Sequence, residues 1–151
     1  MAQPLPLAVR RARRQGLLVE LSLDVPSDLA YVGEAVDLIA GQCEPGVLSP
    51  RRLHFNLRTA LAEALANAIR YGNGLDPAKL VRVRVEVAAD AVRLHVADEG
   101  NGFDLATAPD PTTPDNVGRE DGRGLFVMRH LVDQVTFNDR GNVVCLTLRA
   151  G

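Results

Sequence analysis

Two short runs in which apolar and polar residues alternate place the strongest constraint on the fold of this chain. They span residues 81–87 and 92–96, and the turn Ala88-Ala89-Asp90 separates them. A period of two is typical of a strand with one buried and one solvated face, and the short turn makes the pair an antiparallel hairpin. The apolar rows need cover, which other elements must supply. Their members are Val81, Val83, Val85, Val87, Val92, Leu94 and Val96.

Two amphipathic helices are the predicted cover. Residues 29–43 carry apolar side chains at spacings of three and four, which predicts a helix running to about Gln42 with Ser27 as its N-cap. A second helix, about six turns long, is expected from Ser49-Pro50 to the stop signal Gly72-Asn73-Gly74, because proline favours the first helical position and glycine the last turn. Its apolar stripe is Leu53, Leu57, Leu61, Leu65, Ala68 and Ile69.

The remaining segments complete an α/β (α+β) two-layer sandwich. Residues 98–121 are acidic, rich in proline and without periodicity, which predicts a long loop. Hairpins demand antiparallel pairing and the helices must lie on one apolar face, so we expect a mostly antiparallel mixed sheet with three helices on one face. The other predicted elements are strands at residues 17–25, 135–137 and 143–148 and a third helix at residues 123–132.

Composition fits one soluble globular domain. The chain has 151 residues, of which 46% are hydrophobic and 24% charged, so a disordered, collagen-like or disulfide-scaffold protein is excluded. A net charge of −2 does not suit a nucleic-acid binder, and no run approaches the roughly 18 apolar residues of a membrane span. Cys43 and Cys145 are expected to be small buried hydrophobes in a reducing cytoplasm.

The first residues differ from the rest of the chain. Residues 1–16 contain two prolines and four arginines, and we expect a flexible N-terminal segment before a domain at residues 17–151. A strand beginning near Leu7 is the alternative. The arginines form either a solvated end or a patch for an acidic partner. Because they follow the short apolar stretch, the order does not fit a secretory signal.

A polar row on the second helix is the first candidate for chemistry. Glu63, Asn67, Arg70 and Tyr71 stand three or four residues apart, so they share one helical face. A solvated stripe would explain the row equally well. The alternating alanines at positions 62, 64, 66 and 68 favour something that approaches the helix closely.

Two glycine motifs follow later in the chain. Asp98-Glu-Gly-Asn-Gly-Phe103 stands where a strand ends, and its glycines permit close approach of a ligand to the backbone. Asp121-Gly-Arg-Gly-Leu125 begins the third helix, where free N–H groups and the helix dipole favour a phosphate. Alone, the first is equally a strand-ending turn and the second equally a hinge. Neither a Rossmann nor a Walker A pattern is present.

Together the three motifs are far more specific. Their order and separation resemble the GHKL (Bergerat-fold) ATP-binding domain of gyrase, histidine kinases and MutL, with an N box at residues 63–72, a G1 box at 98–103 and a G2 box at 122–125. The resemblance covers about residues 17–148. Within that superfamily the Arg70-Tyr71-Gly72 ending and the run from Gly124 to Val135 look most like the anti-sigma factor serine/threonine-protein kinases of bacterial partner-switching systems.

The resemblance implies specific roles for three polar residues. Asn67 would hold a Mg²⁺ ion that bridges the phosphates of ATP, and this ion prefers oxygen ligands. Asp98 would accept a hydrogen bond from the adenine amine. Glu63 would be the catalytic general base for a seryl hydroxyl, a role that contributes typically about a hundredfold to ten-thousandfold.

The resemblance also assigns a nucleotide-contacting set. Gly100 and Gly102 would let the base and sugar lie against the backbone, and Gly122 and Gly124 would wrap the phosphates. Helix-end amides with Arg119 or Arg123 would neutralise charge during phosphoryl transfer. The same set contains Arg70, Phe103 and Leu125.

The function implied by this branch is phosphorylation of an anti-anti-sigma (STAS-type) protein by an ATP-dependent kinase that also sequesters a sigma factor. A cytoplasmic homodimer is implied, with no direct nucleic acid and no membrane. The alternative is an ATP-gated anti-sigma or regulatory module without transfer chemistry, which the acidic, proline-broken loop favours.

A two-component histidine kinase is a weaker interpretation. Such kinases need a phosphoacceptor histidine followed by an acidic residue. His54, His95 and His130 are followed by phenylalanine, valine and leucine, respectively.

Overall fold

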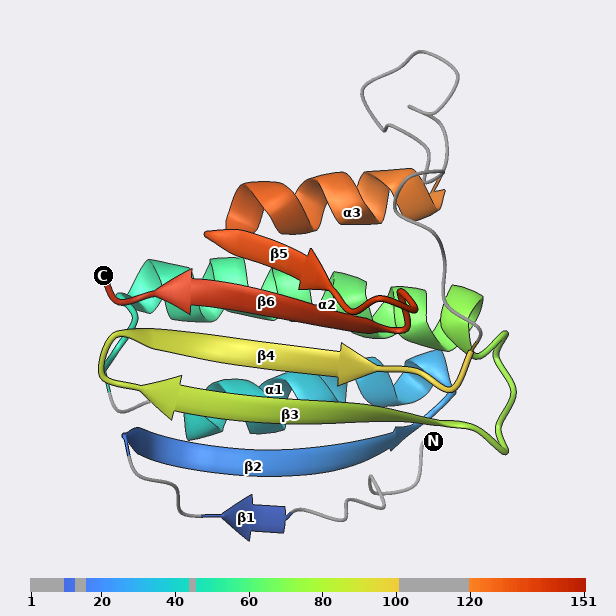
Figure 1. The fold of residues 1–151 in the computed structure, drawn as a ribbon, viewed down its shortest axis with the longest axis horizontal. Helices are drawn as coiled ribbons and strands as arrows, with labels where there is room; N and C mark the ends of the chain where they lie inside the picture. The colour runs from blue at the N-terminus through green and yellow to red at the C-terminus, as the bar shows by residue number, and fades with distance from the viewer. Residues whose placement is uncertain (1–9, 13–15, 44–45, 101–119) are drawn as a thin grey trace.

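The computed structural model describes residues 10–12, 16–43, 46–100 and 120–151. A six-stranded sheet in the order β1-β2-β3-β4-β6-β5 forms one layer (Figure 1). Every pairing among the described strands is antiparallel, so the two-layer α+β prediction is confirmed with an antiparallel sheet. The strands are β1 (Arg10–Ala12), β2 (Leu17–Pro26), β3 (Leu80–Ala88), β4 (Ala91–Ala97), β5 (Gln134–Phe137) and β6 (Val143–Arg149).

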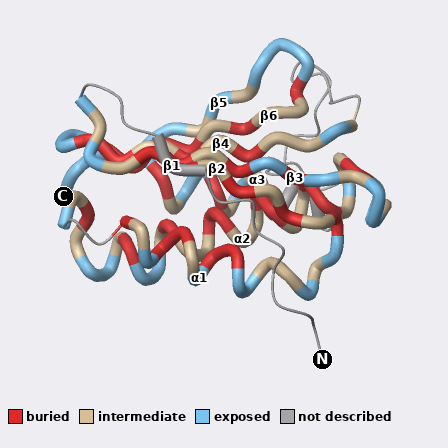
Figure 2. Tube along the Cα trace, turned by 90° about the horizontal axis from the view of Figure 1, so that it is seen from below, coloured by how far each residue is buried: buried red, intermediate tan, exposed pale blue. Residues whose placement is uncertain are grey.

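Helices form the second layer, on one side of the sheet (Figure 2). The first is α1 (Val32–Gln42), preceded by the short 3-10 helix η1 (Leu29–Tyr31). Residues 50–72 form one continuous helix, called the long helix below, in which α2 (Arg58–Asn67) is flanked by the π-helical segments η2 (Arg52–Leu57) and η3 (Ala68–Gly72). The third is α3 (Glu120–Leu131). No helix among the described residues is long and apolar enough to cross a membrane.

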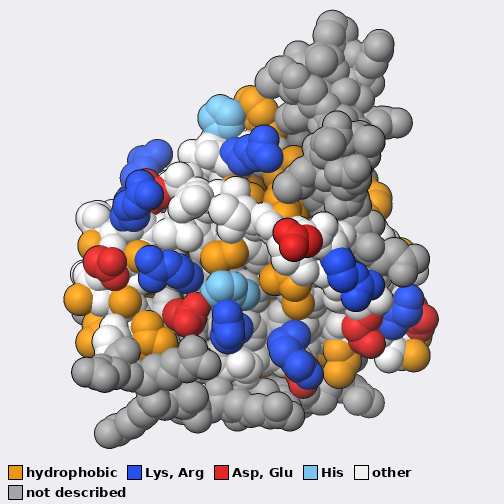
Figure 3. All heavy atoms as spheres, in the orientation of Figure 1, with side chains coloured by type: hydrophobic (Ala, Val, Ile, Leu, Met, Phe, Trp, Pro, Cys, Tyr) orange, Lys and Arg blue, Asp and Glu red, His pale blue; other side chains and the backbone are white. Residues whose placement is uncertain are grey.

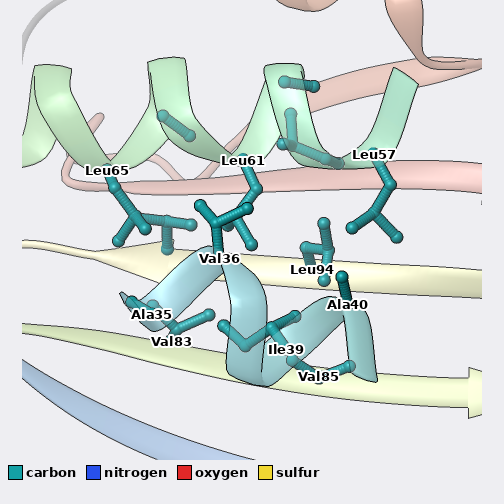
Figure 4. Packing of buried hydrophobic residues seen from close by; sticks show 14 of the residues in the cluster. Ala35, Val36, Ile39, Ala40, Leu57, Leu61, Leu65, Val83, Val85 and Leu94 are labelled. Carbon is teal, nitrogen blue, oxygen red and sulfur yellow. The ribbon is translucent and has the colours of Figure 1, made fainter. Parts of the chain in front are cut away.

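The core lies between the two layers, where the sequence pattern placed it. Leu57, Leu61 and Leu65 of the long helix point toward α1 and the sheet (Figure 4) and are fully buried. The valines of β3 face them with no exposed surface. Burying one such side chain contributes about 1.5–3 kcal/mol, so this interface fixes the long helix firmly against the sheet.

The opposite face of the sheet is polar and carries charges of both signs (Figure 3). Asp24 Oδ1 accepts from Arg82 Nε at 3.0 Å, and His95 Nε2 lies 2.7 Å from Glu86 Oε1. Cys145 also lies here, half-buried, with Sγ 4.0 Å from His95 Nε2. Burial alone would raise the pKa of the Cys145 thiol, but the contacts with His95 and Thr147 together outweigh it and lower that pKa.

The prediction that both cysteines are buried hydrophobes is therefore confirmed only for Cys43. Cys43 is buried in the core, and burial raises its pKa to about 12. Cys145 is not a core hydrophobe, because it belongs to the polar row of β6 that faces away from the helices.

Two element boundaries differ from the sequence predictions. Ser27 is not the N-cap; Asp28 takes this role by accepting from the Ala30 N–H at 2.9 Å. The third helix begins at Glu120 rather than at residue 123, which agrees with the preference of acidic residues for a first helical turn. Within the N-terminal segment, Arg10–Ala12 form β1, which pairs with β2, whereas Leu7, the expected start of the alternative strand, lies outside the described residues.

Candidate nucleotide-binding site

Glu63 and Asn67 lie one turn apart on the long helix and face α3. A methyl group added at Gly124 of α3 would lie 2.9 Å from Asn67 Nδ2 and 3.1 Å from Glu63 Oε2. Both polar side chains therefore converge on a helix backbone that carries no side chain at this point. The resemblance to the GHKL domain implies that these residues surround one nucleotide, although they are about sixty residues apart in the chain.

Asp98 marks the other end of the candidate site. It follows β4 directly, and its backbone N–H donates to Asn142 O at 2.9 Å. Its Oδ1 accepts from the Gly100 N–H at 2.7 Å. A side chain at Gly72 would overlap the Asp98 carboxyl group, and one at Gly100 would overlap the Gly72 carbonyl. The end of the long helix and the turn after β4 are thus in close contact only because both residues are glycine.

The environment of Asp98 alters its acidity. Partial burial raises the pKa of this carboxyl group, opposed by the hydrogen bond from Gly100 and by the positive charge of Lys79. A raised pKa is typical of a functional carboxylate, although ion-pair networks produce it too.

Asn73 completes the site and was missed by the sequence analysis, which interpreted it only as part of a helix stop. It is 2% exposed. Its Oδ1 accepts from the Glu99 N–H at 2.7 Å, and its Nδ2 donates to Ser27 Oγ at 2.9 Å and to Leu80 O at 3.1 Å. The only signal in the sequence was an amide residue between two glycines, a pattern that also suits a plain turn.

The residues suit an adenine nucleotide with Mg²⁺. Glu63 and Asn67 each bring a side-chain oxygen close to the Gly124 backbone, and Mg²⁺ prefers oxygen ligands. At the other end, a half-buried carboxylate adjoins backbone that carries no side chains at Gly72 and Gly100. Asn67 is the residue that could hold the metal, and Asp98 the one that could select the base.

The other predicted site residues have varied positions. Arg70 and Leu125 are half-buried on η3 and α3. Gly122 and Arg123 belong to the first turn of α3, so these two and Gly124 are inside a helix rather than in the loop before it. Gly102, Phe103 and Arg119 lie outside the described residues.

An antiparallel sheet with helices on one face, a polar row on the long helix and a carboxylate beside glycine backbone define a nucleotide-binding domain of the GHKL type. The histidine kinase-like ATPase domain family matches residues 25–148, and the chain belongs to this family. The resemblance inferred from the three motifs is confirmed.

Two relatives show which proteins of this family the chain is similar to. The chain is 27% identical over 132 residues to serine-protein kinase RsbW of Oceanobacillus iheyensis, covering 83% of each chain. It is 26% identical over 98 residues to serine-protein kinase RsbW of Staphylococcus aureus (strain bovine RF122), covering 60% of this chain and 62% of that protein. The chain is thus similar to serine-protein kinases within its family.

Proposed function

We propose that this protein is an ATP-dependent serine/threonine-protein kinase that acts as an anti-sigma factor. One observation carries the proposal: Glu63 and Asn67 converge on the Gly124 backbone, while Asp98 lies beside glycine backbone where the same helix ends, at Gly72. Similarity to serine-protein kinases supports it. The substrate would be a seryl hydroxyl of a STAS-type anti-anti-sigma protein, and the chain would act as a cytoplasmic homodimer that binds a sigma factor.

Each residue has a defined task in this proposal. Asp98 accepts a hydrogen bond from the exocyclic amine of adenine, a donor that guanine lacks at that position. Asn67 holds Mg²⁺ through its amide oxygen. Bound Mg-ATP supplies the phosphoryl group and the cation that offsets its charge. Glu63 accepts the proton of the attacking hydroxyl, or orients it.

The test is transfer of phosphate from Mg-ATP to the serine of a cognate anti-anti-sigma protein. Glu63→Gln should lower the transfer rate about a hundredfold to ten-thousandfold, because the proton acceptor is lost, and should change ATP affinity less than threefold. Glu34→Gln is the matched control, since Glu34 is an exposed glutamate on α1, and it should transfer at the wild-type rate.

Two results would contradict the kinase proposal. Absence of phosphoserine while ATP is bound would leave an ATP-gated anti-sigma module as the function. A Glu63→Ala protein that regulates its partner normally would favour the same alternative.

A further inference from the structure

Asn73 joins three segments that are distant in sequence. Its side chain bonds Ser27 after β2, Leu80 at the start of β3 and Glu99 in the turn after β4. Ser27 in turn donates to Lys79 O at 2.7 Å. The Asn73 amide uses both an acceptor and a donor, as a buried amide must to offset the cost of burial.

The bond to Glu99 acts directly on the turn that contains Asp98. Glu99 is the neighbour of Asp98, and its carboxylate also accepts from the Leu80 N–H. On the other side of Asp98 the chain is fixed by the bond to Asn142 O. The Asp98 carboxyl itself bonds Gly100 and contacts Gly72, the residue before Asn73. The Asn73 side chain therefore links the residue that caps the long helix to the backbone of this turn.

We propose that Asn73 is a positioning residue for purine selection, which holds the Asp98 carboxylate in place through its hydrogen bond to the Glu99 N–H. This inference depends on the proposed nucleotide site. Selection of one purine requires the acceptor to stand within about 0.5 Å of its ideal hydrogen-bonding position to the base amine, and such precision comes from hydrogen bonds that fix the backbone behind it.

The oxygen and the nitrogen of the Asn73 amide bond different partners, so positioning of the Asp98 turn can be tested separately from stability of the fold. Oδ1 accepts from the Glu99 N–H in the turn that contains Asp98, whereas Nδ2 donates to Ser27 Oγ and Leu80 O. Removing Ser27 Oγ takes away one partner of Nδ2 but leaves the Glu99 bond. Ser27→Ala is therefore a control that perturbs the same buried network without touching the turn.

The experiment measures ATP and GTP binding by calorimetry for the wild type, Asn73→Ala and Ser27→Ala, with thermal unfolding of each. Asn73→Ala should weaken ATP about fivefold to tenfold and GTP little, so that discrimination falls by the same factor. Ser27→Ala should lower the unfolding temperature yet keep wild-type discrimination. Unchanged discrimination in folded Asn73→Ala would overturn the inference and leave the proposed function standing.

Amide hydrogen exchange provides a readout that needs no nucleotide. In the wild type the Glu99 N–H should be protected, and Asn73→Ala should accelerate its exchange at least tenfold more than that of amides in β3. A wild-type Glu99 amide that exchanges without protection would overturn the inference even if ATP binds. A wild type that binds neither nucleotide would overturn the proposed function, and purine selection with it.

A second variant covers the case in which Asn73→Ala does not fold. Asn73→Asp retains an oxygen acceptor for the Glu99 N–H but loses the Nδ2 donor to Ser27 Oγ and Leu80 O. It should keep wild-type discrimination while unfolding at a lower temperature. Lost discrimination in folded Asn73→Asp would contradict the assigned role of the acceptor.

Discussion

The two ends of the long helix differ in what their polar groups do. At the N-terminal end, Arg52 forms an ion pair with Asp133 and donates to Arg149 O at 2.7 Å, and Asn56 Nδ2 donates to Leu131 O at 3.0 Å. These bonds attach the helix to β6 and to the end of α3. At the C-terminal end, Glu63 and Asn67 instead face glycine backbone. The polar groups of the first end therefore fix the fold, whereas those of the second belong to the proposed nucleotide site.

Backbone geometry alone does not distinguish the two ends. Both η2 and η3 are π-helical, although only η3 adjoins the candidate site. Short π-helical segments are frequent at functional sites. Here the glycine backbone beside the polar groups, rather than the π-helical turns, distinguishes the end that we propose to be functional.

The largest expected effect is at the structural end. Leu57→Ala should lower the free energy of unfolding by about 2–5 kcal/mol, because Leu57 is fully buried between the layers and its truncation leaves a cavity. ATP affinity of the folded variant should stay within about twofold of the wild type. Denaturant unfolding and calorimetry measure the two quantities. A loss of affinity as large as the loss of stability would show that the two ends are not separate.

A smaller effect is expected at the functional end. Gly124→Ala should lower ATP affinity about tenfold, because the new methyl group displaces the Asn67 amide, and should leave stability nearly unchanged since alanine favours helix. Gly33→Ala is the matched control. Gly33 lies in α1 with nothing within 4 Å of an added methyl group, so this change should stabilise the protein by up to about 1 kcal/mol and leave ATP binding unaltered.

The sequence predicts much of the fold and part of the candidate site. Alternation and helical spacing predict β3, β4 and the long helix, because each pattern follows from which face is buried. The motif order predicts that Glu63, Asn67 and Gly124 meet. The network of Asn73 was not predictable, since its partners Ser27 and Glu99 come together only in the folded chain. The polar environment of Cys145 depends likewise on its neighbour in β4, His95.

The smallest predicted effect concerns pH. Burial raises the pKa of Asp98, so its carboxylate gains a proton at a higher pH than an ordinary aspartate as the solution is acidified. ATP affinity should then fall about threefold to tenfold, because a neutral acceptor loses the charge-assisted bond.

The contribution of Asp98 to the free energy of unfolding should change in the opposite direction to ATP affinity, rising as the solution is acidified. A carboxyl group whose pKa is raised by folding contributes stability below its unfolded pKa and loses it as pH rises through the folded value. Asp98→Asn should therefore be at least as stable as the wild type at neutral pH. Calorimetry and thermal unfolding across pH, with this variant as the reference, test both statements. A wild type and variant with the same pH dependence of ATP binding would exclude Asp98 as its source.

The most direct test of the nucleotide site is calorimetric titration of the wild type and Asp98→Asn with ATP and GTP in the presence of Mg²⁺. We expect the wild type to bind ATP in preference to GTP and Asp98→Asn to lose that preference. A wild type that binds neither nucleotide, or an Asp98→Asn protein that still prefers ATP, would contradict the assignment of Asp98 and the end of the long helix as an adenine-nucleotide site.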